Sequence, residues 1–492
     1  MRGRIVLAVI FLAAFILLFR LILLAGELDA IVTAAQFEAA RENHTTLRAF
    51  LHPMPKGADL HTHLSGAVYA ERFLAWGAQE GFCVDVEKVV LAKPQCDRAG
   101  ARPLSDAMRD QKFYDRLVDA FSMRDFLPTP ALPAGRDEFF AVFDRFGTVS
   151  GSRFVDMTVD QLKLYDSQNV QYVEFMTSAY CPNDRGKFVA AVAAASDDAA
   201  KLAALEASGL AECVAGKRND LAAAFGKISA ALGCEADNTQ AGCGVTFRYI
   251  VQIYRDNPPD DVFVQTATAA ALIRAEPRLV GLNLVGPEDY LVARRDYTRQ
   301  MEIIRFLAKD VPVALHAGEL WLGLVPPPDL TFHIRQAIEI GGARRIGHGV
   351  SLAFERDAQG LLADMRARPV AVEVSLTSND LILGVRGKDH PFPVYLTAGV
   401  PVVLSTDDAG VSRIDLTNEY FRAARDYGLG YAQLKAIARN SLSYSFLADN
   451  QKRDQLERFE HRSAEFEHAV ASRQSPFSKA VALIKAAVIA PP

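Results

Sequence analysis

Eight short apolar runs recur along this chain, and each is bounded by polar or turn-forming residues. Runs of this length, rich in Val, Ile and Leu without polar alternation, are typical of strands that are covered on both faces of a parallel sheet. The predicted strands are Gly57–His61, Val170–Thr177, Val245–Tyr254, Leu279–Val285, Val311–His316, Arg345–Gly349, Val370–Leu376 and Val400–Ser405.

Amphipathic stretches with helical spacing separate the later strands. Examples are Arg294–Ala308, Thr331–Gly341 and Glu355–Arg368. Eight strands that alternate with helices favour a closed parallel barrel over an open sheet. We therefore predict an α/β fold, a (β/α)8 TIM-type barrel.

Two gaps between strands are longer than one crossover helix needs. Residues 65–168 must hold several helices, and the Ala-rich residues 187–232 favour a helical insertion with Cys213 in its linker. These are predicted as long helical insertions after strands 1 and 2. Three more helical stretches, near 417–428, 433–445 and 451–472, follow the last strand. With no internal repeat or low-complexity linker, residues 29–492 are expected to form one elaborated domain.

The N-terminus has the pattern of an export segment. Arg2 and Arg4 precede the apolar run Ile5–Phe19, and Arg20 separates it from the shorter run Leu21–Ala25. Residues 1–28 are therefore predicted as a signal peptide, with an uncleaved membrane anchor as the alternative. We expect a periplasmic or extracellular protein, which would contact a membrane only through such an anchor.

Composition narrows the classes of partner. The net charge is −5 over 492 residues, half of which are hydrophobic, and the sequence pI is about 6.1. No block or stripe of Lys and Arg is present, so the sequence gives no electrostatic basis for binding nucleic acid. A small-molecule partner is expected, and the oligomeric state is left open.

The six cysteines are predicted to form disulfides, because an even number of cysteines in an exported chain favours such bonds. Pairing of Cys83 with Cys96 and of Cys234 with Cys243 would close short polar loops, and Cys181 with Cys213 remains by elimination. A second metal site is the alternative, although no tight C-x-x-C spacing supports it.

Polar side chains gather where the predicted strands end. His61 and His63 end the first, His316 and Glu319 follow the fifth, His348 lies at the end of the sixth, and Asp407 and Asp408 follow the eighth. Any one of these could be a hydrogen-bonded scaffold residue, a turn or a helix N-cap. Because the carboxyl ends of barrel strands meet at one mouth, their joint occurrence instead indicates a site.

Four motifs, in this order, resemble the adenosine deaminases of the amidohydrolase superfamily. They are Met54–His63 (MPKGADLHTH), His316–Glu319 (HAGE), Arg345–Gly349 (RIGHG) and Ser405–Asp408 (STDD). The resemblance spans residues 54–450. The Pro-Lys-Gly sequence in the first motif and the export segment resemble the exported members of the family more than the short cytosolic ones.

The resemblance implies one Zn²⁺ ion held by His61, His63, His316 and Asp407. Imidazole and carboxylate ligands suit zinc, and a position remains open for water, whose pKa zinc lowers to about 7. It also implies roles in hydrolytic deamination of adenosine, and by extension 2′-deoxyadenosine, to inosine and ammonia. Glu319 would protonate purine N1, His348 would orient the hydroxide and assist its formation, Asp408 would bind N7, and the N–H of Gly286 would meet N3.

One position departs from the family pattern. Where members often carry an acidic residue for the ribose 5′-hydroxyl, this chain has Ser65, which loses a charge-assisted contact. The substrate could therefore be another 6-aminopurine compound, such as adenine or a modified nucleoside. A nucleoside-binding or signalling factor outside the cell is the alternative from a different class.

An aromatic helical face lies in the first long gap. Phe143 shares this face with Phe139 or Phe140, and the rings could cover the purine or pack into the core.

Overall fold

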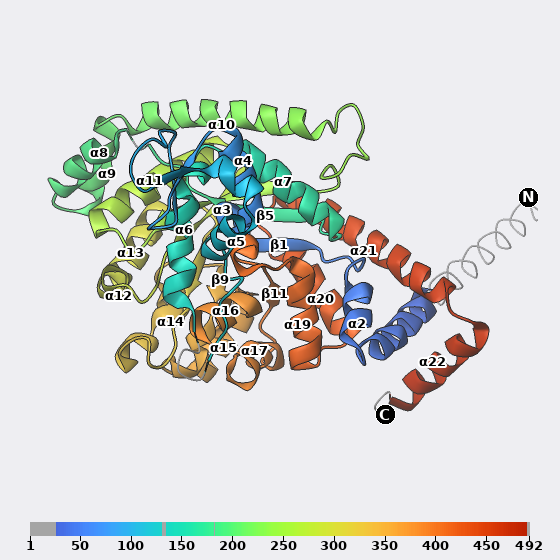
Figure 1. Ribbon diagram of the computed structural model, residues 1–492. Helices are drawn as coiled ribbons and strands as arrows, with labels where there is room; N and C mark the ends of the chain where they lie inside the picture. The colour runs from blue at the N-terminus through green and yellow to red at the C-terminus, as the bar shows by residue number, and fades with distance from the viewer. Residues whose placement is uncertain (1–25, 130–133, 182, 490–492) are drawn as a thin grey trace, which may run out of the picture.

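The computed structural model describes residues 26–129, 134–181 and 183–489. Its centre consists of eight parallel strands in two four-stranded sheets, ordered β1-β5-β6-β7 and β11-β10-β9-β8 (Figure 1). The strands are β1 (Ala58–His63), β5 (Tyr172–Thr177), β6 (Thr246–Tyr254), β7 (Leu279–Val285), β8 (Ala314–Ala317), β9 (Arg345–His348), β10 (Ala371–Val374) and β11 (Val402–Leu404).

Backbone hydrogen bonds join the two sheets at both edges. Asp407, just after β11, accepts from the N–H of His63 at 3.0 Å and donates its own N–H to the carbonyl of His61 at 2.9 Å. At the other edge Leu282 of β7 donates to the carbonyl of Pro312 at 3.1 Å. The eight strands thus close into a cylinder, and the predicted (β/α)8 TIM-type barrel is confirmed. All eight predicted strands are present, with ends shifted by at most three residues.

Helices surround the barrel and cover its outer face (Figure 1). Their apolar stripes pack on strands whose residues are mostly buried, as expected for strands covered on both faces. The helices outside the two insertions are α2 (His44–Leu51), α7 (Phe154–Ser167), α11 (Pro259–Ala275), α12 (Leu291–Arg295), α13 (Tyr297–Leu307), α14 (His333–Glu339), α15 (Ala358–Ala367), α16 (Leu376–Leu383), α17 (Phe392–Thr397), α18 (Ala409–Ser412), α19 (Leu416–Tyr427), α20 (Tyr431–Ser443), α21 (Asp449–Ser472) and α22 (Pro476–Ile489).

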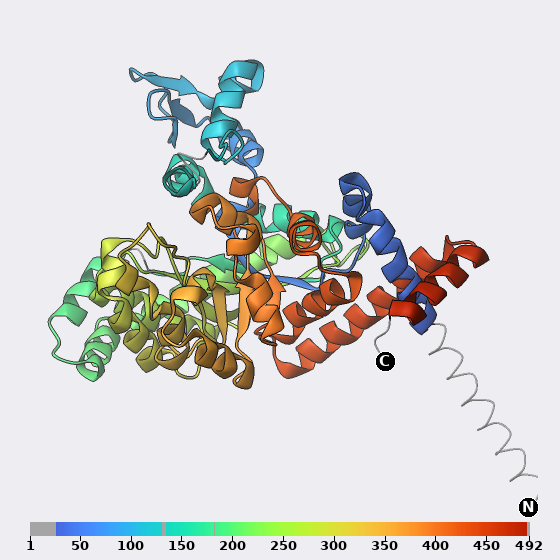
Figure 2. The same cartoon turned by 90° about the horizontal axis from the view of Figure 1, so that it is seen from below.

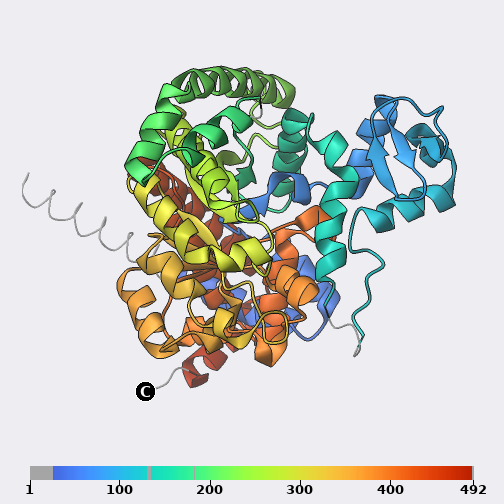
Figure 3. The same ribbon diagram turned by 90° about the vertical axis from the view of Figure 1, so that its left-hand side faces the viewer.

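The first insertion stands out from the barrel as a lobe (Figures 2 and 3). Its helices were predicted, but its three-stranded antiparallel sheet, ordered β3-β2-β4, was not. The Cys83–Cys96 disulfide ties this sheet, as predicted. The elements are α3 (Leu64–Ala67), α4 (Ala70–Gln79), β2 (Cys83–Asp85), β3 (Val90–Ala92), β4 (Ala101–Pro103), the 3₁₀ helix η1 (Leu104–Arg109), α5 (Gln111–Ala120) and α6 (Arg136–Ser150).

The second insertion comprises α8 (Arg185–Ala193), α9 (Asp198–Ala207) and the long α10 (Leu210–Leu232). The placement of Cys213 in a linker was wrong, because the chain turns at Gly209, which has a φ of +102°, and Cys213 already lies in the first turn of α10. The predicted bridges are confirmed: Cys181 pairs with Cys213, and Cys234 pairs with Cys243.

The two ends of the described chain lie side by side. A helix over residues 26–40 packs against α21 and α22, where Val32, Ala471 and Ala482 form a small apolar cluster. Residues 1–25, which hold nearly all of the predicted signal peptide or anchor, lie outside the described residues. Within the described part, no helix combines the length and apolar character that a membrane span needs.

Candidate metal centre and active site

A cavity of about 330 Å³ opens at the carboxyl ends of the barrel strands. Its walls come from the strand ends, from α6 and from the loops after β7, β8 and β11. The lining residues are His63, Ser65, Phe139, Phe140, Phe143, Asp144, Gln252, Tyr254, Asp256, Val285, Gly286, Pro287, Tyr290, His316, Glu319, Ile382, Asp407 and Asp408.

Three imidazoles and one carboxylate meet at the base of this cavity. One ligand-type atom from each of His61, His63, His316 and Asp407 lies within 4.8 Å of the other three. His63 Nε2 is 3.3 Å from His316 Nε2 and 3.2 Å from Asp407 Oδ1. His61 Nε2 is buried and has no hydrogen-bond partner among the described residues. Four converging donor atoms, one of them unsatisfied, fit a single metal ion of the zinc type.

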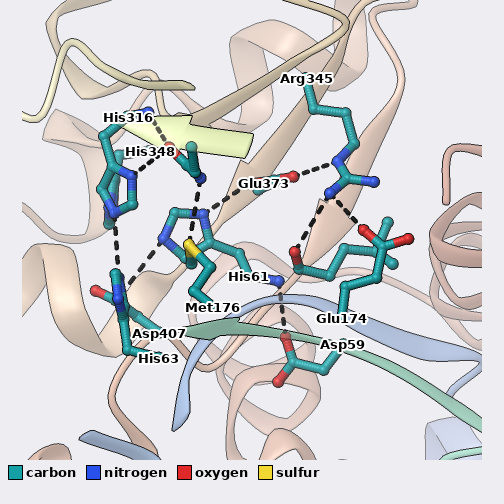
Figure 4. Close-up of polar contacts among 12 residues, drawn as sticks. Asp59, His61, His63, Glu174, Met176, His316, Arg345, His348, Glu373 and Asp407 are labelled. Carbon is teal, nitrogen blue, oxygen red and sulfur yellow. Dashed lines mark hydrogen bonds and ion pairs between the residues drawn. The ribbon is translucent and has the colours of Figure 1, made fainter. Parts of the chain in front are cut away.

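The tautomers of the three histidines also fit a metal. Each donates its Nδ1–H to a side-chain oxygen, which leaves the lone pair of Nε2 pointing into the cluster. Figure 4 shows the contact between His61 and Glu373. The pairs are His61 with Glu373 at 2.6 Å, His63 with Gln252 at 2.8 Å and His316 with Asn283 at 2.9 Å.

Local backbone geometry brings these side chains together. Gly347 on β9 leaves room for the His61 ring, since a Cβ there would lie 2.6 Å from His61 Cε1. His348 and Asp407 both have left-handed backbones, with φ of +68° and +59°. Such conformations cost about 1–3 kcal/mol each and are typically retained at functional sites. Ser378 donates to Asp407 Oδ2 at 2.6 Å and fixes the orientation of the carboxylate.

Glu319 reaches the cavity from the loop after β8. Burial, together with the neighbouring carboxylates of Asp407 and Glu288, raises the pKa of Glu319 well above its usual value. The raised pKa favours the protonated carboxyl, which is the form that an acid catalyst requires. Its Oε1 is buried without a hydrogen-bond partner among the described residues and lies 3.6 Å from His348 Nε2.

Glu288 holds the loop that carries Glu319. Its carboxylate accepts from the backbone N–H of Glu319 at 2.7 Å and of Gly318 at 3.1 Å, and from His333 Nδ1 at 2.6 Å. Burial alone would raise the pKa of Glu288, but the charges of His333 and Arg255 and these hydrogen bonds lower it to about 2.

Asp408 lies beside the four candidate metal ligands and faces the cavity. Burial and the charge of Asp407 raise the pKa of Asp408 well above its usual value, which favours the protonated carboxyl, the form that can donate a hydrogen bond. Gly66 makes this position possible, since a Cβ on it would lie 1.6 Å from Asp408 Oδ1. Ser65 and Gly286 also line the cavity, so every residue predicted for the site lies in or beside one pocket.

Three phenyl rings of α6 form one wall of the cavity. Phe139 is buried, whereas Phe140 and Phe143 are half-buried, and all three line the pocket. The face therefore packs partly into the core and also borders the cavity, and covering of a purine stays a prediction. Arg136, in the first turn of α6, donates to Asp289 from Nε at 2.9 Å and from Nη2 at 2.8 Å. This contact joins the helix to the loop after β7.

Sequence reasoning did not find the residues that orient the ligands. Glu373 and Asn283 each stand alone in an apolar strand of the barrel, and Gln252 lies between the apolar Val251 and Ile253 of β6. A single polar side chain in such a run needs a partner, because burying it without one costs several kcal/mol. That cost was the signal that could have identified them.

The fold and this side-chain set define a class, a (β/α)8 barrel with a candidate mononuclear metal centre at its strand ends. Residues 223–461 match the family model for adenosine deaminase. That range contains His316, Glu319, His348, Asp407 and Asp408, whereas the His61–His63 pair lies before it. This part of the chain is therefore similar to the adenosine deaminase family.

Curated relatives agree over part of the chain. The adenosine deaminase of Enterococcus faecalis is 31% identical over 179 residues, which cover 36% of this chain and 49% of that protein. That of Salmonella schwarzengrund is 37% identical over 142 residues, which cover 29% of this chain and 39% of that protein. The chain thus spans about half the length, or less, of these relatives.

Solved structures share the fold. The N6-methyl-AMP deaminase of Arabidopsis thaliana superposes with a TM-score of 0.55 at 20% identity, over 85% of this chain and 99% of that one. A zinc-bound amidohydrolase of Burkhoderia ambifaria gives a TM-score of 0.52 at 18% identity, over 87% and 95% of the two chains.

Proposed function

We propose that this protein is a zinc-dependent hydrolase that converts adenosine, and also 2′-deoxyadenosine, to inosine and ammonia. The observation that carries the proposal is the arrangement of Glu319 and His348 around the space next to the four candidate ligands. Ligands, acid and orienting imidazole thus converge on one buried point, which is the constellation that hydrolytic deamination needs. The match of residues 223–461 to the adenosine deaminase family supports it.

The proposed reaction adds water across the purine C6–N1 bond. The water oxygen bonds to C6, while Glu319 gives its carboxyl proton to N1 and takes up one proton of the water in return. The remaining proton of the new C6 hydroxyl then goes to N6, the C6–N6 bond breaks, ammonia leaves and C6 becomes the carbonyl carbon of inosine. A metal ion at the four ligands would supply a water of lowered pKa. Asp408 would donate to N7 and the Gly286 N–H to N3, while the α6 phenyl rings would cover the purine face and exclude water.

The lining of the cavity favours a nucleoside over a nucleotide. Asp144 and Asp256 lie on its wall, and none of the described lining residues is Lys or Arg. A 5′-phosphate would therefore meet negative charge without a cationic partner. The Arabidopsis barrels, described as an N6-methyl-AMP deaminase and as complexes with IMP and GMP, keep other 6-aminopurine substrates as the second candidate.

We further propose export from the cytoplasm, with residues 1–28 as a signal peptide or an anchor. The three disulfides support this location, because such bonds persist in oxidising compartments. Residues 29–492 would then form the single catalytic domain.

A substrate panel with one variant tests the proposal. Purified protein with Zn²⁺ should lose the ultraviolet absorbance of adenosine, with little activity on adenine or AMP. Glu319→Gln should keep one metal ion per chain and lower kcat by about 100-fold or more, the usual contribution of an acid catalyst. Glu206→Gln, on the exposed surface of α9, is the matched control. Adenosine binding without turnover in the wild type would instead favour a nucleoside-binding factor.

A further inference from the structure

Three hydrogen bonds in sequence link His348, through Asn379 and His390, to the backbone N–H of Phe392. We infer that Asn379 and His390 fix neutral His348 with its proton on Nε2, so that it serves the site as a hydrogen-bond donor and not as a proton acceptor. The inference rests on the proposed function for its catalytic meaning. The tautomer itself follows from the geometry alone.

The donor–acceptor direction of these three hydrogen bonds is set at Phe392. The backbone N–H of Phe392, at the start of α17, points to His390 Nδ1 at 3.1 Å. A backbone N–H can only donate, so His390 Nδ1 accepts and carries no proton. The proton of the neutral ring is then on Nε2. Burial and the charge of Arg422 lower the pKa of His390 to about 3, which agrees with a neutral ring.

The same reasoning gives the orientation of the Asn379 amide and then the tautomer of His348. His390 Nε2 lies 2.9 Å from Asn379 Oδ1 and donates to it. The amide nitrogen of Asn379 then faces His348 Nδ1 at 2.9 Å and donates in turn. His348 Nδ1 is thus an acceptor, and the ring proton is on Nε2. Because Phe392 fixes the first step, the orientation of the Asn379 amide is not a free choice.

His348 therefore differs from the three candidate ligands. His61, His63 and His316 each donate Nδ1–H to an oxygen and present a bare Nε2, whereas His348 accepts at Nδ1 and presents Nε2–H. This difference explains how four imidazoles can lie within one cluster while only three are suited to bind a metal.

The proton on Nε2 has a specific place to act. His348 Nε2 is buried, has no partner among the described residues and lies 3.6 Å from Glu319 Oε1, too far for a hydrogen bond. One ligand-type atom from each of His348, Glu319 and Asp407 borders the same space. An oxygen that enters this space receives a hydrogen bond from His348, which orients it toward the purine and stabilises negative charge on it. Asn379 and His390 are thus positioning residues.

The tautomer can be measured directly in the zinc-loaded protein. With ¹⁵N-labelled histidine at pH 7, the nitrogen shifts of His348 should report a bare Nδ1 and a protonated Nε2. In Asn379→Asp the carboxylate can only accept, so the proton should move to Nδ1. We expect kcat for adenosine to fall by about 100-fold or more with little change in KM, since a wrong tautomer disables an active-site imidazole.

Two variants of His390 separate tautomer control from packing and add no charge. His390→Gln keeps an amide N–H that can donate to Asn379, and should retain the wild-type shifts and a kcat within about threefold. His390→Leu removes the donor, frees the amide to turn, and should give a mixture of tautomers with a lower kcat. Protonated Nδ1 in wild-type His348, or equal kcat losses in the Gln and Leu variants with unchanged shifts, would overturn the inference. The shifts need no substrate, so an inactive protein with the expected tautomer would refute only the proposed function.

Discussion

At the scale of single residues, Gly66 shows how a missing side chain can shape a binding group. A Cβ at this position would overlap Asp408 Oδ1 at 1.6 Å and Cγ at 2.5 Å. Gly66→Ala should therefore displace the Asp408 carboxyl and lower kcat/KM for adenosine on the order of 10- to 100-fold, because an unsatisfied buried partner costs about 1–3 kcal/mol. Metal content should not change, since Asp407 keeps its own contact with Ser378.

Gly226→Ala is the matched control for that variant. Gly226 lies in α10, where an added Cβ would meet nothing within 4 Å, and alanine favours a helix. Steady-state kinetics of both variants checks the prediction, and a Gly66→Ala enzyme with normal kcat/KM would contradict the assigned position of Asp408.

Glu288 gives a prediction about pH. Its pKa in the folded protein is about 2, below the ordinary value of 4.5. The unfolded chain therefore takes up a proton first as the pH falls, and the stabilisation by Glu288, about 3 kcal/mol, is present above pH 4.5 and is lost toward pH 2. Urea unfolding between pH 6 and 3 should show a steeper loss of unfolding free energy for the wild type than for Glu288→Gln. Parallel curves would contradict this prediction.

The ligands could be predicted from sequence and their partners could not. His61, His63, His316 and Asp407 sit in contiguous motifs at strand ends, where one-dimensional spacing already implies a shared location. Their partners lie inside strands distant in the chain and meet them only when the barrel closes. The same holds for His390, which sequence context alone places in an ordinary loop.

At the scale of elements, Arg136 holds α6 against the cavity. It pairs with Asp289, and its guanidinium lies over the rings of Tyr290 and Phe140, at 5.1 and 5.7 Å, both of which line the cavity. Arg136→Gln should loosen this wall and raise KM for adenosine about three- to tenfold, with a smaller effect on kcat.

Arg153→Gln is the control for that variant. Arg153 is as shielded as Arg136, also joins two carboxylates and stacks on an aromatic ring, but does not line the cavity. A comparable loss of stability is expected for both variants, measured by thermal unfolding, with a rise in KM only for Arg136→Gln. An equal KM effect would show that α6 does not depend on this contact.

The elements themselves were predicted unevenly for a physical reason. The barrel strands lie within longer apolar runs of the sequence, so hydrophobicity alone reveals them, although β11 itself covers only Val402–Leu404. β2, β3 and β4 have only three residues each, of which Cys83, Val84 and Leu91 are buried. Unlike β11, these three strands do not lie within a longer apolar run, so sequence analysis detects no period in them, and their pairing depends on contacts within the lobe.

At the scale of the whole molecule, the candidate metal site bridges one of the two junctions that close the barrel. His61 and His63 come from β1, and Asp407 follows β11 across that junction. A metal ion bound to all three would therefore tie the two sheets together at this edge. At the opposite junction, between Leu282 and Pro312, no candidate ligand makes the backbone contact.

Metal removal should therefore loosen the molecule unevenly. A metal ion at a free concentration of 100 times its dissociation constant stabilises the fold by about 2.7 kcal/mol. Chelation of the ion should remove that stabilisation. Hydrogen exchange should become faster at the backbone amides of His63 and Asp407, while the amide of Leu282 keeps its protection, because only the first junction is held by ligands from both sheets. Added Zn²⁺ should restore protection. Equal loss at both junctions, or none after the ion has been released, would place the ion's stabilising effect elsewhere in the barrel.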